Sequence, residues 1–534
     1  MVRGLVSAPS LVFARLGQDF TPWHWVDAWA RKHPQLRAVA DDSGEINWSE
    51  LKMRAQTLGT RLRRLGITPG MPVVLFANNS TYLVVALLAI QWTGACPVVL
   101  NATCDSHLLE IALEQTGAAF ALVENRSEAE SLRLSPEVRI LAGESGFDSE
   151  PVNSDAPGSR RQRAADDAFA LLFTSGTTGQ PKAISISNFR AVTSGFGMGA
   201  VCLGLGSKDS IYCVLPLSHA TGLLTGLCAA LLTGSALILP RRFSVDGFWQ
   251  DVVRQRATSI IYVGEVARHL LAAPACATEG QHELKCLYGT GMSIDVWHRL
   301  QARFRIPRIV EFYGATELPL AMVNLAAAPG FMGRIALRHL SPWQVLRCNE
   351  DTGELLRRDS GACEPCADFE PGELVFRSRY RTGDIVVRDD LGYVQLVDRQ
   401  ADFYRQKGHN VSTQAVTTIL RSVPSLEAVG VTHIALPRYD GQAGLVVAVP
   451  GQGFELEHIE RAYQRLPQHE RPRFLRLTAS LGLNRGLKFD AIEYRNAGID
   501  PEIVKESLYV YGRAGFVSID SEIWRELQLG LFRF

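Results

Sequence analysis

The sequence has little lysine and no excess of either charge. Among its 534 residues, 55 basic side chains are balanced by 55 acidic ones, and only eight of the basic residues are lysines. A chain without a basic excess has no overall electrostatic attraction to nucleic acid or to anionic membranes. We therefore expect small-molecule partners rather than nucleic acid, and a lysine inside a motif carries more information than it would in a lysine-rich chain.

Long apolar runs and metal-type cysteine spacing are also missing. Residues 1–20 contain too short and interrupted an apolar stretch for a secretory signal. Residues 223–239 are interrupted by glycine, serine and threonine, so a buried helix followed by a buried strand is expected instead of a membrane span. Cys363-x-x-Cys366 has no second pair at zinc-finger spacing, which indicates reduced thiols. We expect a cytoplasmic protein without an integral membrane segment; the sequence leaves the oligomeric state open.

Apolar periodicity predicts an α/β fold in more than one domain, as the chain length requires. Helical and strand patterns alternate along the first 140 residues, which favours a parallel sheet covered by helices. Helices are expected at residues 25–33, 49–65 and 82–93, and strands at 72–76, 97–100 and 119–123. Residues 144–167 have the composition of a surface linker. A second alternating block follows at 168–335, and short strands with turns at 336–397.

The densest signal is a turn rich in hydroxyl groups and glycine. Apolar residues 168–173 end at Thr174, six of the eight residues from Thr174 to Pro181 are Ser, Thr or Gly, and Lys182 follows. Glycines let backbone N–H groups approach phosphate oxygens, hydroxyls donate to them or lie near Mg²⁺, and lysine adds one mobile charge. The Walker pattern is absent. The turn therefore predicts a polyphosphate-binding loop of another kind.

Two further motifs suit a nucleotide. In Glu311-Phe-Tyr-Gly-Ala-Thr-Glu317 an aromatic ring can stack on a purine, a hydroxyl can meet the α-phosphate and a carboxylate can hold Mg²⁺. In Tyr380-Arg-Thr-Gly-Asp384 a carboxylate follows a glycine turn and can accept hydrogen bonds from both ribose hydroxyls. Each motif is weak alone, but together with the hydroxyl-rich loop they indicate an ATP site.

In their order, these motifs resemble the adenylate-forming superfamily of acyl-CoA synthetases, luciferases and peptide-synthetase adenylation domains. The resemblance runs from about residue 20 to the C-terminus. It is closest to the fatty-acid transport protein and very-long-chain acyl-CoA synthetase group, through Tyr262-Val-Gly-Glu265, residues 304–317 and residues 407–413. It implies an N-terminal adenylation domain of helix-covered sheets, residues 1–398, that binds ATP and the acid. A small mobile α+β C-terminal domain, residues 399–534, is implied to carry the catalytic lysine.

The resemblance also implies roles for particular residues. Those expected to bind the nucleotide are Thr174, Ser175, Gly176, Thr177, Thr178, Gly179, Lys182, Gly289, Thr290, Gly291, Tyr313, Gly314, Ala315, Thr316, Asp384 and Arg399. Those expected to be catalytic are Lys488, Thr316, Glu317 and Lys182. Glu317 and Thr178 are the implied Mg²⁺ ligands, and His219, Tyr262 and Leu318 the implied lining of the substrate pocket. Lys488 would stabilise the charge that builds at the bridging oxygen when a carboxylate attacks the α-phosphate.

The chain departs from this group where the acyl length and the thiol half-reaction are controlled. Leu318-Pro319 replaces the usual Gly-Asn, and a leucine there should shorten a lipid tunnel. Ala401 stands for a glycine at the expected hinge, His409 for a glutamate, Gln414-Ala415 for Thr-Glu, and residues 484–486 for Thr-Gly-Thr before Lys488. Alanine narrows the backbone freedom available for a rotation at the hinge.

The leading hypothesis is an AMP-forming acid ligase that uses ATP, Mg²⁺ and, as co-substrate, CoA. Its acid would be a fatty or aromatic carboxylic acid smaller than a very long chain, in specialised metabolism. The alternative is an ATP-dependent diazotase-type enzyme that activates nitrite for attack by an aryl amine, without CoA. A third class, a degenerate ATP-binding transport or scaffold protein, is disfavoured because Lys182, Glu317, Asp384, Arg399 and Lys488 are all present.

Overall fold

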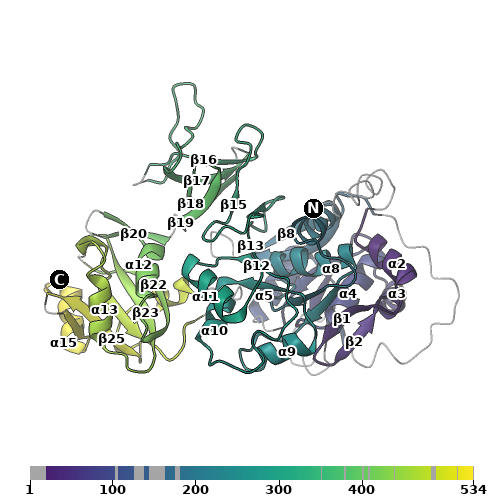
Figure 1. Cartoon of the computed structure of the whole chain (residues 1–534), viewed down its shortest axis with the longest axis horizontal. Coiled ribbons are helices and arrows are strands. Elements are labelled where there is room, and N and C mark those ends of the chain that lie inside the picture. The colour runs from purple at the N-terminus through teal and green to yellow at the C-terminus, as the bar shows by residue number, and fades with distance from the viewer. Residues whose placement is uncertain are drawn as a thin grey trace. The chain divides into compact units, whose positions relative to one another are not determined.

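The chain forms two compact units, Met1–Pro329 and Gly330–Phe534, and each is described by itself (Figure 1). The computed structural model describes residues 20–102, 106–124, 138–142, 163–174, 181–349, 352–377, 380–399, 402–406, 409–437, 439, 441–482, 489–513, 515–532 and 534. The domain boundary expected at residues 398 and 399 stays a prediction.

One sheet of the first unit has the strand order β6-β5-β3-β4-β7-β8. Its strands are β3 (Pro72–Phe76), β4 (Cys96–Leu100), β5 (Phe120–Val123), β6 (Arg139–Ala142), β7 (Ala168–Thr174) and β8 (Lys182–Ser187). All neighbours are parallel except β7 and β8, which form an antiparallel pair around the hydroxyl-rich loop. Because β7 pairs with β4, a strand of the second alternating block completes the sheet of the first block.

The other sheet of this unit has the order β14-β13-β12-β11-β9-β10-β1-β2. Its strands are β1 (Arg37–Asp41), β2 (Gly44–Asn47), β9 (Ser210–Cys213), β10 (Ala236–Leu239), β11 (Ser259–Val263), β12 (Cys286–Thr290), β13 (Ile309–Tyr313) and β14 (Met322–Val323). The strands from β13 to β1 run parallel, and the antiparallel strands β14 and β2 close the two ends. The expected parallel, helix-covered architecture is confirmed.

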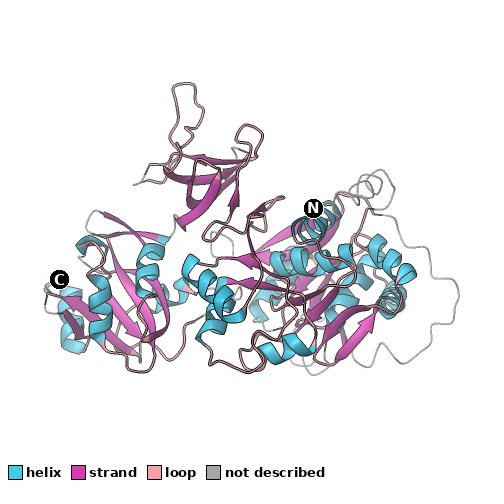
Figure 2. Ribbon diagram, in the orientation of Figure 1, coloured by secondary structure: helices cyan, strands magenta, loops and turns pink. Residues whose placement is uncertain are grey.

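Helices pack on both sheets (Figure 2). The helices of the first unit are α2 (Trp23–Lys32), α3 (Trp48–Arg64), α4 (Thr81–Thr93), α5 (Ser106–Thr116), α7 (Asn188–Phe196), η1 (Gly197–Cys202), η2 (Thr221–Leu227), α8 (Cys228–Thr233), α9 (Phe248–Arg254), α10 (Gly264–Ala272) and α11 (Ile294–Phe304). The helices expected at 49–65 and 82–93 and the strand at 72–76 are confirmed to within one residue at each end. Ser80 caps the N-terminus of α4, and Gly94 ends the helix with φ +90°.

Helix α4 is apolar on every side, and the structure gives the reason. It contacts β3 and β4 of one sheet and β1 of the other, so it lies between the two sheets. A helix that is hydrophobic all round is stable only where all its faces are covered. The expectation for residues 223–239 is also confirmed, since η2, α8 and β10 are built of buried residues. In the described part of the chain, no helix is long and apolar enough to cross a membrane.

The described part of the second unit contains three further sheets, one of which is a two-stranded hairpin. The first has the order β15-β19-β18-β17-β16, with β15 (Gly333–Arg334), β16 (Trp343–Leu346), β17 (Pro371–Phe376), β18 (Tyr380–Arg388) and β19 (Tyr393–Arg399). Strands β16, β17 and β18 lie within residues 336–397, where short strands with turns are expected, whereas β15 precedes this range and β19 extends two residues beyond it. The hairpin of β20 (Phe403–Gln406) and β21 (His409–Ser412) follows.

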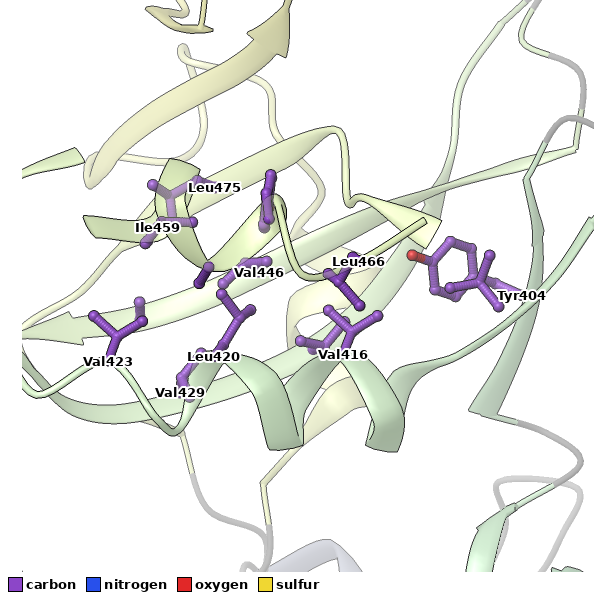
Figure 3. Packing of buried hydrophobic residues seen from close by; sticks show 14 residues of the cluster. Tyr404, Val416, Leu420, Val423, Val429, Val446, Ile459, Leu466 and Leu475 are labelled. Carbon is purple, nitrogen blue, oxygen red and sulfur yellow. The ribbon is translucent and has the colours of Figure 1, made fainter. Parts of the chain in front are cut away.

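The last sheet carries the C-terminal core. It consists of β22 (Leu426–Ala435), β23 (Gln442–Pro450), β24 (Phe474–Leu477), β25 (Ser507–Gly512) and β26 (Gly515–Ser518), with α12 (Thr413–Leu420), α13 (Leu456–Tyr463), η4 (Gln468–Glu470), α14 (Ala491–Ala497) and α15 (Ser521–Leu529). Figure 3 shows Val416 and Leu420 of α12 packed with Val446 of β23 in this core. An α+β C-terminal region is therefore present, as expected.

Candidate functional site

The candidate site lies where parallel strands of the larger sheet end. Strands β11, β12 and β13 are neighbours and run in the same direction, so their carboxyl ends meet at one edge of the sheet. Ligands of open parallel α/β sheets bind outside this edge. The two segments that leave it are residues 289–292, here called the 289–292 turn, and residues 313–318, here called the 313–318 loop. They contain nine of the site residues predicted from the sequence.

Three residues of these strands form one row across the sheet. Tyr262 of β11 is paired with Gly289 of β12, and Gly289 is paired with Glu311 of β13. Side chains of one row lie on the same face of a sheet. Gly289 contributes no side chain, and the Tyr262 hydroxyl donates a hydrogen bond to Glu311 Oε1 across it. Tyr262, expected in the substrate pocket, is thus a buried residue paired with a carboxylate; its contact with substrate stays a prediction.

Glu311 also binds the backbone of the 289–292 turn. Its Oε2 accepts a hydrogen bond from Gly291 N at 3.0 Å and its Oε1 accepts one from Met292 N at 3.1 Å. The Glu311 side chain is buried, and this burial raises the pKa of its carboxyl from 4.5 to about 7, against the lowering effect of its hydrogen bonds. The carboxyl group therefore changes its charge near neutral pH.

A second charged residue holds the 313–318 loop. Arg190 of α7 donates from Nη1 to the Thr316 carbonyl and from Nη2 to the Ala315 carbonyl, the latter at 3.1 Å. Inside the loop, Leu318 N donates to the Ala315 carbonyl at 3.0 Å. Burial lowers the pKa of Arg190, which Glu317 partly offsets. The guanidinium thus fixes the backbone that presents Thr316 and Glu317.

The two sheets meet at this site. Thr174, at the end of β7, places its hydroxyl 3.5 Å from Glu317 Oε1, although the two residues are 143 positions apart. Lys182 is paired with Thr174 across the β7–β8 hairpin and is exposed. The start of the hydroxyl-rich loop and the carboxylate of the second motif are therefore neighbours. The remaining loop residues of the prediction, Ser175, Gly176, Thr177, Thr178 and Gly179, lie outside the described residues.

The residues expected to line the substrate pocket differ in exposure. Leu318 is 2% exposed, so its side chain is enclosed by the protein. His219 is partly exposed and precedes the π-helix η2, whose Leu223 N donates to the His219 carbonyl at 2.9 Å. Asn79 fixes the segment before His219, since its Nδ2 donates to the Leu215 carbonyl at 2.9 Å and its Oδ1 accepts from Leu217 N at 3.0 Å.

In the second unit, two predicted nucleotide residues are backbone partners in adjacent strands. Asp384 of β18 is paired with Arg399 of β19 in antiparallel register. The turn before Asp384 is held by the fully buried Glu373, which accepts from Gly383 N at 3.1 Å and pairs with the Arg381 guanidinium. Gly383 has φ +72°, which favours glycine. The predicted catalytic Lys488 and the predicted hinge at Ala401 lie outside the described residues.

The sequence interpretation assigned no site role to Arg190, Asn79 or Glu311. All three bind backbone atoms of the predicted motifs from a distance in sequence. Glu311 is the first residue of a quoted motif, and a charged residue directly after the apolar pair Ile309-Val310 is a signal that could have singled it out. Arg190 and Asn79 carry no comparable local signal.

The comparison with known proteins agrees with this geometry. The profile of the family described as AMP-binding enzyme matches residues 26–382. The chain belongs to this family of adenylate-forming enzymes. It is 29% identical to long-chain fatty acid transport protein 1 of Mus musculus over 562 residues, which cover 94% of this chain and 86% of the mouse protein.

Another curated member of the AMP-binding family is a ligase. The chain is 28% identical over 527 residues to the medium/long-chain-fatty-acid–CoA ligase FadD6 of Mycobacterium tuberculosis, covering 91% of this chain and 87% of that one. Among solved structures, the anthranilate CoA ligase AuaEII in complex with anthranoyl-AMP has the same fold, with a TM-score of 0.74 at 19% identity over 90% of this chain and 98% of the other. The protein is an enzyme of the AMP-forming acid–CoA ligase family.

Proposed function

We propose that the enzyme joins ATP and a carboxylic acid into an acyl-adenylate, releases pyrophosphate, and then transfers the acyl group to CoA. The observation that carries this proposal is the contact of Thr174 with Glu317, which brings the start of the hydroxyl-rich loop to the second nucleotide motif. A polyphosphate and its metal ion need hydroxyl, carboxylate and cationic groups in one place. Thr174 and Lys182 are paired in the β7–β8 hairpin and Glu317 lies beside Thr174, so the three residues would supply these groups.

The donor set suits Mg²⁺, which prefers carboxylate and hydroxyl oxygens and keeps several waters. Glu317 is exposed and would hold the ion, with Thr178 of the loop as the second protein ligand. The ion would neutralise phosphate charge and orient the leaving pyrophosphate. Gly314 supports a nucleotide beside it, because a Cβ there would meet only Ala321, at 3.6 Å. The protein's own packing therefore leaves space beside this glycine, which a nucleotide would use.

The residues of the chain have defined parts in the first step. The acid's carboxylate attacks the α-phosphorus while the bond to pyrophosphate breaks. Thr316 would donate to an α-phosphate oxygen from a loop that Arg190 holds rigid, and Tyr313 would stack on adenine. Asp384 and Arg399 would bind the ribose, and Lys488 would stabilise the charge at the bridging oxygen. In the second step the CoA thiolate attacks the acyl carbon and AMP leaves.

The acid is a fatty or aromatic acid smaller than a very long chain. Leu318 supports this limit, because its enclosed side chain directly follows Glu317, on the loop that would face the acyl group. The fatty-acid ligase and the anthranilate ligase among the relatives act on acids of these two kinds, by their names. The predicted division into residues 1–398 and 399–534, with rotation between the half-reactions, belongs to this proposal.

The test is pyrophosphate release with ATP and Mg²⁺ over a panel of fatty acids, aromatic acids, and nitrite with an aryl amine, each with and without CoA. Turnover of an organic acid with stoichiometric consumption of CoA and formation of AMP is the expected result. Turnover that needs nitrite and an amine and ignores CoA would replace the ligase by the diazotase-type activity. A complete lack of pyrophosphate release with every acid would overturn the proposal.

A further inference from the structure

We propose that Glu311 and Tyr262 are positioning residues that hold the 289–292 turn in the form that receives the nucleotide. This inference rests on the proposed function for the ligand, and on the structure for the contacts. One buried carboxylate binds a phenol from β11 and two amides from the turn after β12, and it is itself part of β13. Three adjacent strand ends are therefore tied to one side chain at the edge where the candidate site lies.

The missing side chain of Gly289 makes this arrangement possible. A Cβ on Gly289 would lie 2.1 Å from the Tyr262 carbonyl oxygen and 2.9 Å from its Cγ, so any other residue would displace the tyrosine that reaches Glu311. A Cβ on Gly264 would likewise lie 2.0 Å from the Gly291 carbonyl oxygen. The turn is thus packed against the end of β11 at backbone distance, and small shifts of Glu311 or Tyr262 change its shape directly.

The three hydrogen bonds favour the ionised form of Glu311, against the effect of burial. The Tyr262 hydroxyl and the amides of Gly291 and Met292 are all donors, and a carboxylate is an acceptor at both oxygens. A protonated carboxyl group would bring a fourth donor to a place where three donors already converge. Burial and the neighbouring Glu311 raise the pKa of Tyr262 well above its ordinary value, so the phenol remains a donor throughout.

The elements next to the strand of Glu311 carry a few charged side chains. On α10, which follows β11, Glu265 and Arg268 form an ion pair with each other, with Arg268 Nε 3.0 Å from Glu265 Oε2. Asp295 lies in the first turn of α11, which follows the 289–292 turn. On the side of β14, the contact is a backbone one, from Asn324 N to the Glu311 carbonyl at 2.8 Å. Burial is the main cause that raises the pKa of Glu311 to about 7, so the ionised form is gained as the pH rises through neutrality.

The test compares Glu311→Gln and Tyr262→Phe with the wild-type enzyme. Glutamine places an amide donor where the structure needs an acceptor and does not titrate, so it imitates the protonated carboxyl group at every pH. The matched control is Tyr212→Phe, because Tyr212 is a buried tyrosine of the same sheet whose hydroxyl donates to Asp251 Oδ2 at 2.7 Å, on α9. Two readouts are used: pyrophosphate release against ATP concentration between about pH 5 and 9, and amide hydrogen exchange of residues 289–292.

We expect kcat/KM for ATP to rise with pH through about 7 in the wild type, with KM carrying most of the change. In Glu311→Gln, kcat/KM should not rise with pH in this range (this rise is the pH limb of the profile), and KM should be about tenfold higher. In Tyr262→Phe the limb should move to higher pH, because the phenol hydrogen bond lowers the pKa of Glu311. Tyr212→Phe should keep the wild-type profile. An unchanged pH limb and an unchanged KM in Glu311→Gln would overturn the inference. If Glu311→Gln does not fold, the pH limb of Tyr262→Phe is the deciding measurement.

Hydrogen exchange separates this inference from the proposed function. Faster exchange of the Gly291 and Met292 amides in both variants, but not in Tyr212→Phe, is expected even if no acid in the panel is turned over. That combination would reject the proposed function and keep the positioning role. Unchanged exchange in both variants would reject the positioning role whatever the activity.

Discussion

Replacing Glu311 by glutamine should change the stability of the protein in a pH-dependent way. Folding raises the pKa of this carboxyl from 4.5 to about 7, which means that the folded state binds the proton more tightly than the unfolded state does. A group of this kind contributes stability that is fully present below pH 4.5 and is lost as the pH rises through about 7. A difference of about 2.5 between the two pKa values corresponds to about 3 kcal/mol of unfolding free energy.

The assay is urea unfolding of the wild type and of Glu311→Gln at a series of pH values. The difference between the two proteins removes the contribution of all other titrating groups. Relative to the variant, the wild type should lose about 3 kcal/mol between about pH 4 and 8. A difference that does not depend on pH would refute both the burial argument and the assigned pKa direction.

Glu279→Gln is a control of opposite sign. Glu279 accepts hydrogen bonds from Arg303, with Nη2 at 2.9 Å, and this contact lowers the pKa of its carboxyl. Its stabilising contribution is therefore present above its ordinary pKa and lost as the pH falls. Relative to this variant, the wild type should gain stability with rising pH. Ionisation of Glu311 is expected to improve the use of ATP. A rise in pH through about 7 should therefore remove the stability that protonated Glu311 contributes and at the same time raise the activity of the enzyme.

Three further predictions concern the site. Arg190→Met removes two hydrogen bonds from a charged group to the 313–318 loop and should lower kcat/KM for pyrophosphate release at least about tenfold; Arg190→Lys should recover part of the loss, and an unaffected Arg190→Met would show that the loop needs no clamp. Leu318→Gly should move the preference toward longer acids in a chain-length series, and an unchanged preference would remove Leu318 from the pocket. Lys488→Ala should abolish adenylate formation while a titration still detects ATP binding; full adenylation activity would show the lysine assignment to be wrong.

Local patterns in the sequence predicted much of the fold because they reflect local physics. Helix α4 and strand β3 follow from apolar composition and from the serine and glycine that bound the helix. The pairing of β7 with β4 could not be predicted, because no local pattern states which strands become neighbours when several similar apolar strands are available. For the same reason the sequence could not show that each sheet of the first unit combines strands from both alternating blocks, residues 1–140 and 168–335.

The predicted site residues were those that belong to motifs, and the supporting residues were missed. Arg190 acts on carbonyl groups 125 and 126 positions away, and Glu311 on amides 19 and 20 positions away. Every residue other than proline has such an amide and every residue has such a carbonyl, so the partner leaves no mark in the sequence. A polar side chain in a buried strand, as at Glu311, is the one sign that such a partner exists.

Gly314 and Gly289 lie at the same sheet edge, but a side chain at the two positions would meet different surroundings. At Gly314 a Cβ would meet only Ala321 at ordinary contact distance, so the packing of the protein itself does not require a glycine there. At Gly289 a Cβ would overlap the backbone and ring of Tyr262, so the constraint comes from the fold. Because Tyr262 in turn binds Glu311, the second glycine serves the nucleotide site only through the pair that it admits. If the positioning role of Glu311 is correct, nucleotide binding at this sheet edge depends on a buried carboxylate that binds the turn through the Gly291 and Met292 amides, and the charge of that carboxylate makes the shape of the turn depend on pH.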